Sequence, residues 1–164
     1  MLIPLKQFIC DTCGEVIQRP EDGWVEWISD RKDESSARLS TGFQIVHHIT
    51  ASPLAESNAE GCYTSREHRS HDHLDHFLEE KYKMAHILKF LDNGPYHEPE
   101  YRGPHIGDMR EYVEFIRRIT IPYYEEARLY WQQALDDNYF DDPNEIAIYG
   151  TDALNGLVKR YSTY

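Results

Sequence analysis

Residues 7–18, QFICDTCGEVIQ, hold the pattern that predicts the fold of the N-terminal region. Two short apolar arms, FI and VI, flank a tight turn that carries Cys10 and Cys13. Two cysteines separated by two residues on such a turn point their sulfur atoms toward one position. Gly14 follows where the turn needs a left-handed backbone, which glycine adopts without steric cost. The stretch therefore predicts two short strands around one half of a metal site.

The knuckle Cys10-x-x-Cys13-Gly14 resembles half of a zinc ribbon or a treble clef, over residues 5–20 only. The resemblance implies a zinc ion with four protein ligands. A second C-x-x-C pair is absent, so two ligands must come from elsewhere in the chain. Zinc held by four side chains is structural, because no coordination position is left for a substrate. Such an ion would stabilise a β module too small to bury its own core.

Cys62 and one histidine of the pair His47-His48 best complete the ligand set. Side chains alternate along a strand, so only one of the two histidines can face the cysteines. We expect His48, because it lies closer to the strand end, where ligands are usually presented. His47, His68 and His71 are alternatives for the third and fourth ligands. The predicted metal ligands are therefore Cys10, Cys13, His48 and Cys62.

The rest of the N-terminal third is predicted to be mainly strand. The runs WVEWI (24–28) and FQIVHHI (43–49) are rich in β-branched and aromatic residues, which favour strands. The polar stretch SDRKDESSARLSTG between them is typical of a long hairpin loop. Residues 50–70 are small and polar, and we interpret them as an irregular connection that carries Cys62.

From about residue 71 onward the hydrophobic period changes to that of a helix. The first helix is predicted to continue to the stop signal DNGP (92–95). A second helix begins at Asp108, and Pro122 must break or kink it after Thr120. The apolar face predicted for the first helix comprises Leu74, Phe77, Leu78, Ala85, Leu88 and Leu91. The last helix is expected to bury Leu154, Leu157, Val158 and Tyr161.

These patterns together predict an α+β protein. A small N-terminal antiparallel β module with the zinc knuckle, residues 1–63, is expected to pack on a C-terminal helical domain, residues 64–164. The helical domain is predicted to contain three to four helices. Because 164 residues suit one compact domain, a single continuous unit is the alternative to two separate parts.

A second candidate site lies in SHDHLDHF, where His71, His73, Asp75 and His76 form the pattern H-x-H-x-D-H. The pattern resembles the metal-binding signature of the metallo-β-lactamase superfamily, and this resemblance implies a two-metal hydrolase. In that family the motif follows a buried hydrophobic strand, whereas the preceding TSREHRS is polar and charged. We therefore interpret the stretch as the start of the first long helix, with its acidic residues near the positive helix N-terminus.

Charge and composition limit the classes of partner. The net charge is −12, with −5 over residues 1–63 and −7 over residues 64–164. This acidity disfavours nucleic-acid binding, which depends on basic side chains, and it suits a basic protein partner. No run approaches the roughly 20 apolar residues of a membrane span. The N-terminus lacks a secretory signal pattern, and three cysteines with one C-x-x-C pair indicate a reducing compartment, so we expect a cytoplasmic protein.

No complete catalytic motif occurs, and we predict no catalytic residue. The favoured function is a zinc-stabilised, non-enzymatic protein-interaction or adaptor protein. One alternative is a metal-dependent hydrolase that uses His71, His73, Asp75 and His76. A further alternative is a small nucleic-acid-associated regulatory factor, because zinc ribbons often have that role, or an acidic inhibitor of such a factor.

Overall fold

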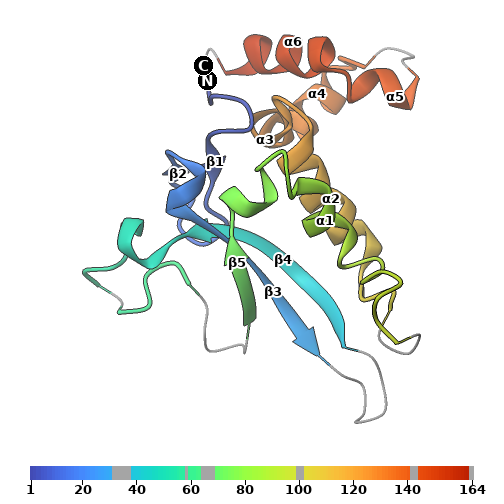
Figure 1. Ribbon diagram of the computed structural model, residues 1–164. Helices are drawn as coiled ribbons and strands as arrows, with labels where there is room; N and C mark the ends of the chain where they lie inside the picture. Colours follow the sequence, from blue (N-terminus) through green and yellow to red (C-terminus); the bar gives the residue numbers. More distant parts are fainter. Residues whose placement is uncertain (31–37, 58, 64–68, 99–101, 141–143, 163–164) are drawn as a thin grey trace.

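The computed structural model describes residues 1–30, 38–57, 59–63, 69–98, 102–140 and 144–162. It confirms the α+β class, with small antiparallel sheets followed by helices in the C-terminal half of the chain. Figure 1 shows the sheet on one side of a long helix, α2, with the last helix, α6, lying across the opposite end of the molecule.

Two antiparallel sheets make up the β part. β1 (Phe8–Ile9) pairs with β2 (Val16–Ile17), as expected for the two arms of the cysteine-bearing turn. The second sheet has the strand order β4-β3-β5, with β3 (Gly23–Asp30) in the centre. Its edges are β4 (Leu39–His47) and β5 (Arg69–His73). The two predicted strand runs therefore lie in β3 and β4, and the third strand comes from beyond residue 63.

The prediction of one long helix from about residue 71 is wrong, because residues Arg69–His73 form the strand β5. All five residues of β5 pair antiparallel with β3. An edge strand with one face in solvent needs no continuous apolar run. The polar composition of Arg69–His73 therefore gave no strand signal, although its backbone completes the sheet.

After β5 the chain forms a 3₁₀ turn, η4 (Asp75–Phe77), and then the six-residue helix α1 (Lys83–Leu88). Phe77 is fully buried, as the predicted helical face requires. Ala85 and Leu88, which were assigned to the same face, are exposed. The apolar spacing interpreted as one helix thus arises from two separate segments with different orientations.

The second predicted helix is confirmed as α2 (Met109–Thr120). The carboxylate of its N-cap, Asp108, accepts hydrogen bonds from the backbone N–H groups of Arg110 and Glu111. The helix ends ahead of Pro122, which cannot donate a backbone hydrogen bond. Four helices follow: α3 (Tyr124–Ala127), α4 (Trp131–Asp136), α5 (Glu145–Ile148) and α6 (Thr151–Tyr161). The described residues thus form six short or medium helices, against the three to four predicted. The described residues also include the 3₁₀ segments η1 (Pro20–Asp22), η2 (Ile49–Ala51) and η6 (Arg128–Tyr130).

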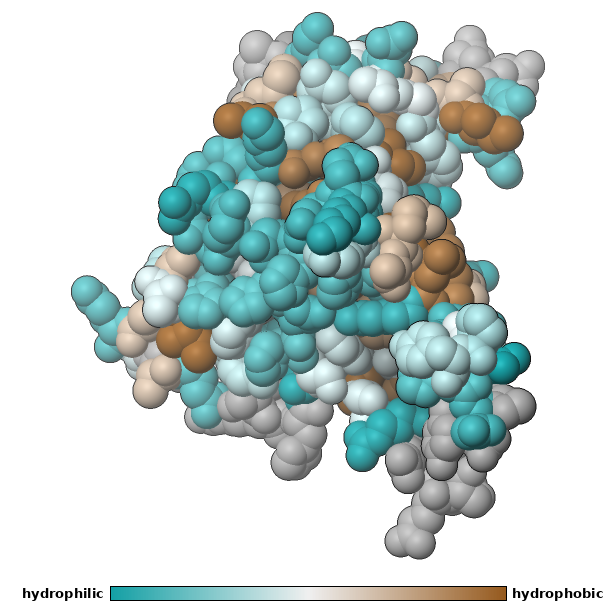
Figure 2. All heavy atoms as spheres, viewed as in Figure 1, coloured by the Kyte–Doolittle hydropathy of each residue, from teal (hydrophilic) through white to brown (hydrophobic). Residues whose placement is uncertain are grey.

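The buried side chains form two groups. The sheet-side core comprises Phe8, Cys10, Ile17, Trp24, Val25, Ile45, Val46, Cys62, Leu74, Phe77, Ile87, Phe90, Tyr112, Phe115 and Ile119. The helical core comprises Tyr124, Ala127, Ala134, Leu154, Leu157, Val158 and Tyr161. The last four of these confirm the burial predicted for the C-terminal helix. Figure 2 shows that the viewed face is largely hydrophilic, with small apolar patches near the helices.

Candidate metal centre

The cysteine-bearing turn between β1 and β2 is closed by backbone hydrogen bonds. The amide of Gly14 donates to the carbonyl of Cys10 at 2.9 Å, and the amide of Cys10 donates to the carbonyl of Glu15 at 3.0 Å. Gly14 has a φ of +78°, in the left-handed region, and a β-carbon there would meet no atom within 4 Å. Glycine is therefore required by the backbone angle of the turn and not by lack of space.

Four side chains from distant parts of the chain meet at this turn. Cys10 and Cys13 are joined by His47, at the end of β4, and by Cys62, and one ligand atom of each lies within 4.8 Å of the others. The His47 Nδ1 is 3.5 Å from the Cys13 sulfur and 3.8 Å from the Cys62 sulfur. Cys10, Cys62 and His47 are buried. These residues form a Cys3His set that can hold a metal ion, and we call it the cysteine tetrad.

The histidine of the tetrad is His47, whereas we expected His48 from the sequence. Strand alternation admits only one of the two, and β4 ends with His47 on the side of the cysteines. His48 lies just beyond the strand, where its Nδ1 contacts the Thr50 hydroxyl at 2.8 Å and its ring packs on Trp24. The position of the strand end could not distinguish His47 from His48, because the docking of the turn on β4 determines which face of the strand lies against the cysteines.

Of the other two alternatives, His71 is not part of the described tetrad. His71 lies on β5 and stacks on the indole of Trp24, with 4.4 Å between ring centroids. His68 lies outside the described residues. Cys62, in contrast, takes the place predicted for it.

Hydrogen bonds from its neighbours fix the tetrad to the sheet. The amide of Asp11 donates to the carbonyl of Ile45 at 2.8 Å, and the Asp11 carboxylate accepts from the amide of Ile45 at 2.7 Å. The Thr12 hydroxyl donates to the carbonyl of Cys62 at 2.9 Å. The Ser52 hydroxyl donates to the Cys62 sulfur at 3.0 Å. The turn is thus docked on β4 and tied to the segment that supplies the third cysteine.

Burial shifts the pKa values of three tetrad residues, Cys13, His47 and Cys62. Burial raises the pKa of Cys62 to about 12, and it also raises the pKa of Cys13. Burial lowers the pKa of His47. Near neutral pH these thiols are therefore protonated and the imidazole is neutral. A metal ion must displace the thiol protons, whereas the imidazole is already in its ligating form.

The residues of the H-x-H-x-D-H pattern are divided between different surroundings. His71 and His73 alternate with Asp72 on β5, and both approach the ring of Trp24. His76 follows in η4, where its Nδ1 lies 2.9 Å from the Asp72 carboxylate. Among the described residues, the candidate metal-holding groups contain His76 but neither His71 nor His73. The structure therefore does not gather the four predicted hydrolase residues at one point.

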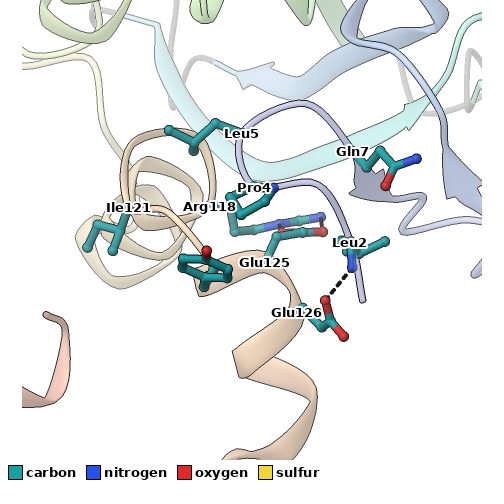
Figure 3. A pocket seen from close by; sticks show the side chains of 9 residues that line it. Leu2, Pro4, Leu5, Gln7, Arg118, Ile121, Glu125 and Glu126 are labelled. Carbon is teal, nitrogen blue, oxygen red and sulfur yellow. Dashed lines mark hydrogen bonds and ion pairs between the residues drawn. The ribbon is translucent and has the colours of Figure 1, made fainter. Parts of the chain in front are cut away.

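A buried ion pair that was not predicted from the sequence joins the sheet-side core to the helices. The Arg118 guanidinium donates two hydrogen bonds to the Glu125 carboxylate, at 2.7 and 2.9 Å, and one to Asp11 at 2.6 Å. Figure 3 shows this pair beneath the N-terminal segment, where the backbone N–H of Leu2 donates to Glu126. No local pattern signals this pair, because the three charged partners come from separate segments.

The chain gives no match to protein-family models, curated proteins or solved structures. Among the described residues, no helix has both the length and the apolar character that crossing a bilayer requires. Function is therefore inferred from the geometry of the chain itself.

Proposed function

We propose that the cysteine tetrad binds zinc as a structural ion, and that the protein acts by binding another protein without catalysis. The observation that carries the metal part is the spacing of the ligand atoms. Tetrahedral zinc with bonds of about 2.3 Å to sulfur and 2.0 Å to nitrogen places these atoms about 3.5 Å apart. The distances from His47 to the sulfurs of Cys13 and Cys62, 3.5 and 3.8 Å, match this requirement.

The composition of the tetrad supports a structural role for the ion. Three thiolates and one imidazole fill the four positions of tetrahedral zinc, so no position is left for a substrate. The ion would join the turn, the end of β4 and the segment of Cys62. These three segments are too far apart in sequence to be connected by local backbone contacts. Ligation by thiols also implies a reducing compartment, such as the cytoplasm.

The surface of α2 supports the interaction part of the proposal. Met109 and Val113 lie one turn apart and are 53% and 37% exposed. A shallow pocket beside them is also lined by Arg110, Glu114 and Arg117. Methionine and arginine are among the residues enriched at protein–protein interfaces. We call this surface the α2 face and propose that it contacts the partner. The net charge of −12 favours a protein over a nucleic acid.

Metal analysis of tag-free protein tests the first part of the proposal. We expect one zinc per chain, with X-ray absorption showing three sulfur ligands and one nitrogen ligand. His47→Ala should lose the zinc and His48→Ala should keep it, because only the first side chain lies in the tetrad. Absence of zinc, or ligation without sulfur, would contradict the proposal.

Affinity capture with matched variants tests the second part. Val113→Glu places a charge on the α2 face, and Ile146→Glu places the same charge on a residue of α5 that is 81% exposed. We expect a protein captured by the wild type to be lost from Val113→Glu and retained by Ile146→Glu. Equal capture by both variants would contradict the assignment of the α2 face as the contact surface. Substrate turnover by the purified chain would contradict the non-catalytic role.

A further inference from the structure

A second group of metal-binding side chains lies away from the cysteine tetrad. Asp72 of β5, His76 of η4 and His86 of α1 each offer one ligand atom, and these atoms lie within 4.8 Å of one another. The Asp72 carboxylate is 2.9 Å from the Nδ1 of His76 and 3.4 Å from the Nδ1 of His86. Two imidazole nitrogens therefore converge on one carboxylate, and the three side chains come from three different elements of the fold.

A cation already lies at this point, in the form of the Lys89 ammonium group. Its Nζ is 3.1 Å from the second carboxylate oxygen of Asp72 and 3.4 Å from the Nδ1 of His86. The position between these two ligands is thus one that stabilises positive charge. Lys89 reaches it with a long side chain that is 35% exposed, so the ammonium can move out into solvent.

The carboxylate at the centre of the group is held in a fixed orientation. The first carboxylate oxygen of Asp72 accepts a hydrogen bond from the backbone N–H of His73 at 2.9 Å. The ring of His86 packs against that of Phe77, which is fully buried, with 5.0 Å between centroids. The acid and one imidazole are therefore positioned by the fold, whereas His76, 46% exposed, can adjust to an ion.

We propose that Asp72, His76 and His86 form a second site, for a divalent transition-metal ion such as Zn²⁺, which the ion enters by displacing the Lys89 ammonium. Two imidazoles and a carboxylate form a nitrogen and oxygen ligand set that suits zinc, cobalt or nickel. Three protein ligands leave one tetrahedral position open to water or to an anionic group. The site differs in this respect from the cysteine tetrad, and the proposal does not depend on the structural zinc.

Zinc titration of tag-free protein tests the second site, with calorimetry as the measurement and with His47→Ala, which lacks a ligand of the tetrad, titrated in parallel. We expect a second equivalent to bind, and His76→Ala and His86→Ala each to weaken it by about tenfold or more. Lys89→Gln removes the competing charge and should tighten the second equivalent by about tenfold. No gain in affinity in Lys89→Gln would contradict the entry of the ion by displacement of the Lys89 ammonium.

Two controls make the test specific. His97→Ala removes a histidine outside the site and should leave the second equivalent unchanged. With Co²⁺ as the probe, the second equivalent should add no sulfur-to-cobalt charge-transfer absorption, because its ligands are nitrogen and oxygen. The inference is overturned if no second equivalent binds to the wild type or to Lys89→Gln. It is equally overturned if the second equivalent binds as tightly to His76→Ala and His86→Ala as to the wild type.

Discussion

The sheet-side core and the helical core are assembled in different ways. The sheet-side core joins residues from Phe8 to Ile119, and the cysteine tetrad, which shares Cys10 and Cys62 with this core, joins residues 10, 13, 47 and 62. The helical core joins only residues between Tyr124 and Tyr161, largely through aromatic and aliphatic packing between neighbouring helices. Long connections must be closed before the first core can form, which costs chain entropy, whereas the second forms from local contacts. Among the described residues, the side-chain groups that could hold a metal ion lie in the first region and not in the second.

Loss of one metal ligand should have the largest effect, and it should affect the two cores differently. Cys10→Ser removes a sulfur from the tetrad. Structural zinc contributes on the order of 10 kcal/mol, which is comparable with the roughly 5–15 kcal/mol that stabilises a whole domain. We expect hydrogen exchange to accelerate strongly over residues 8–63 and much less over residues 124–161. Mass spectrometry of peptides from the two regions measures the difference.

The control for this prediction is His48→Ala, which alters a histidine beside the tetrad and should leave exchange in both regions near the wild-type rate. If Cys10→Ser instead accelerated exchange equally in both regions, the two cores would form one cooperative unit. The distinction between a metal-dependent and a metal-independent core would then fail.

The buried ion pair between the two cores gives the next largest effect. Arg118→Met removes the closest cation from the buried Glu125 carboxylate and leaves it the longer contacts from Arg128, at 3.3 Å; Arg118 and Glu125 are both 5% exposed. Removing one member of a buried pair costs about 3–5 kcal/mol of unfolding free energy. Denaturant unfolding measures the loss. Arg19→Met is the matched control, because Arg19 pairs with Asp22 at the surface and should contribute little. A loss no larger than that of the control would show that Arg118 does not hold the cores together.

A cavity in the helical core should lower stability without loss of the zinc bound by the tetrad. Leu157 is fully buried there, and Leu157→Ala is expected to cost about 2–5 kcal/mol of unfolding free energy. The zinc content of the purified variant should stay at one per chain, because no ligand of the tetrad lies in α6. Thermal unfolding and metal analysis of the same sample check both statements. Loss of zinc together with stability would mean that the helical core supports the tetrad.

The parts of the site that could be predicted from sequence are the local ones. Cys10, Cys13 and Gly14 lie within five residues, so the turn that they form is defined by their own spacing and backbone preference. Cys62 could be added because it is the third cysteine of the chain. The choice between His47 and His48 could not be made locally, since it depends on how the turn docks on β4 through Asp11 and Ile45.

The fold follows the same division between local and long-range information. The N-cap of α2 and its end ahead of Pro122 were predicted correctly, because both depend on nearby residues. β5 was missed, because its polar residues gain order only by pairing with β3, which is about 45 residues earlier. The group of Asp72, His76 and His86 was missed for the same reason, because these residues come together only when β5, η4 and α1 take their places in the fold.

The smallest expected effect concerns the hydrogen bond from Ser52 to the Cys62 sulfur. Burial raises the pKa of Cys62, and the Ser52 hydroxyl opposes that rise by stabilising the thiolate. Ser52→Ala should therefore raise this pKa further and weaken zinc binding by about tenfold, as is typical for residues that orient a ligand. Competition with a chelator measures the affinity, and no change on substitution would contradict the role of the hydroxyl.

The same titration, repeated at several pH values, gives the sign of the linkage. The raised pKa means that the metal-free Cys62 thiol is protonated throughout the neutral range, so zinc must displace that proton. Apparent affinity should fall by about tenfold per pH unit for each displaced proton as the pH decreases. His47 adds no such dependence near pH 7, because burial lowers its pKa and its imidazole is already neutral. An affinity that stayed constant between pH 8 and pH 6 would mean that the thiols are already ionised, and hence that the tetrad is more open to solvent than its buried sulfur atoms indicate.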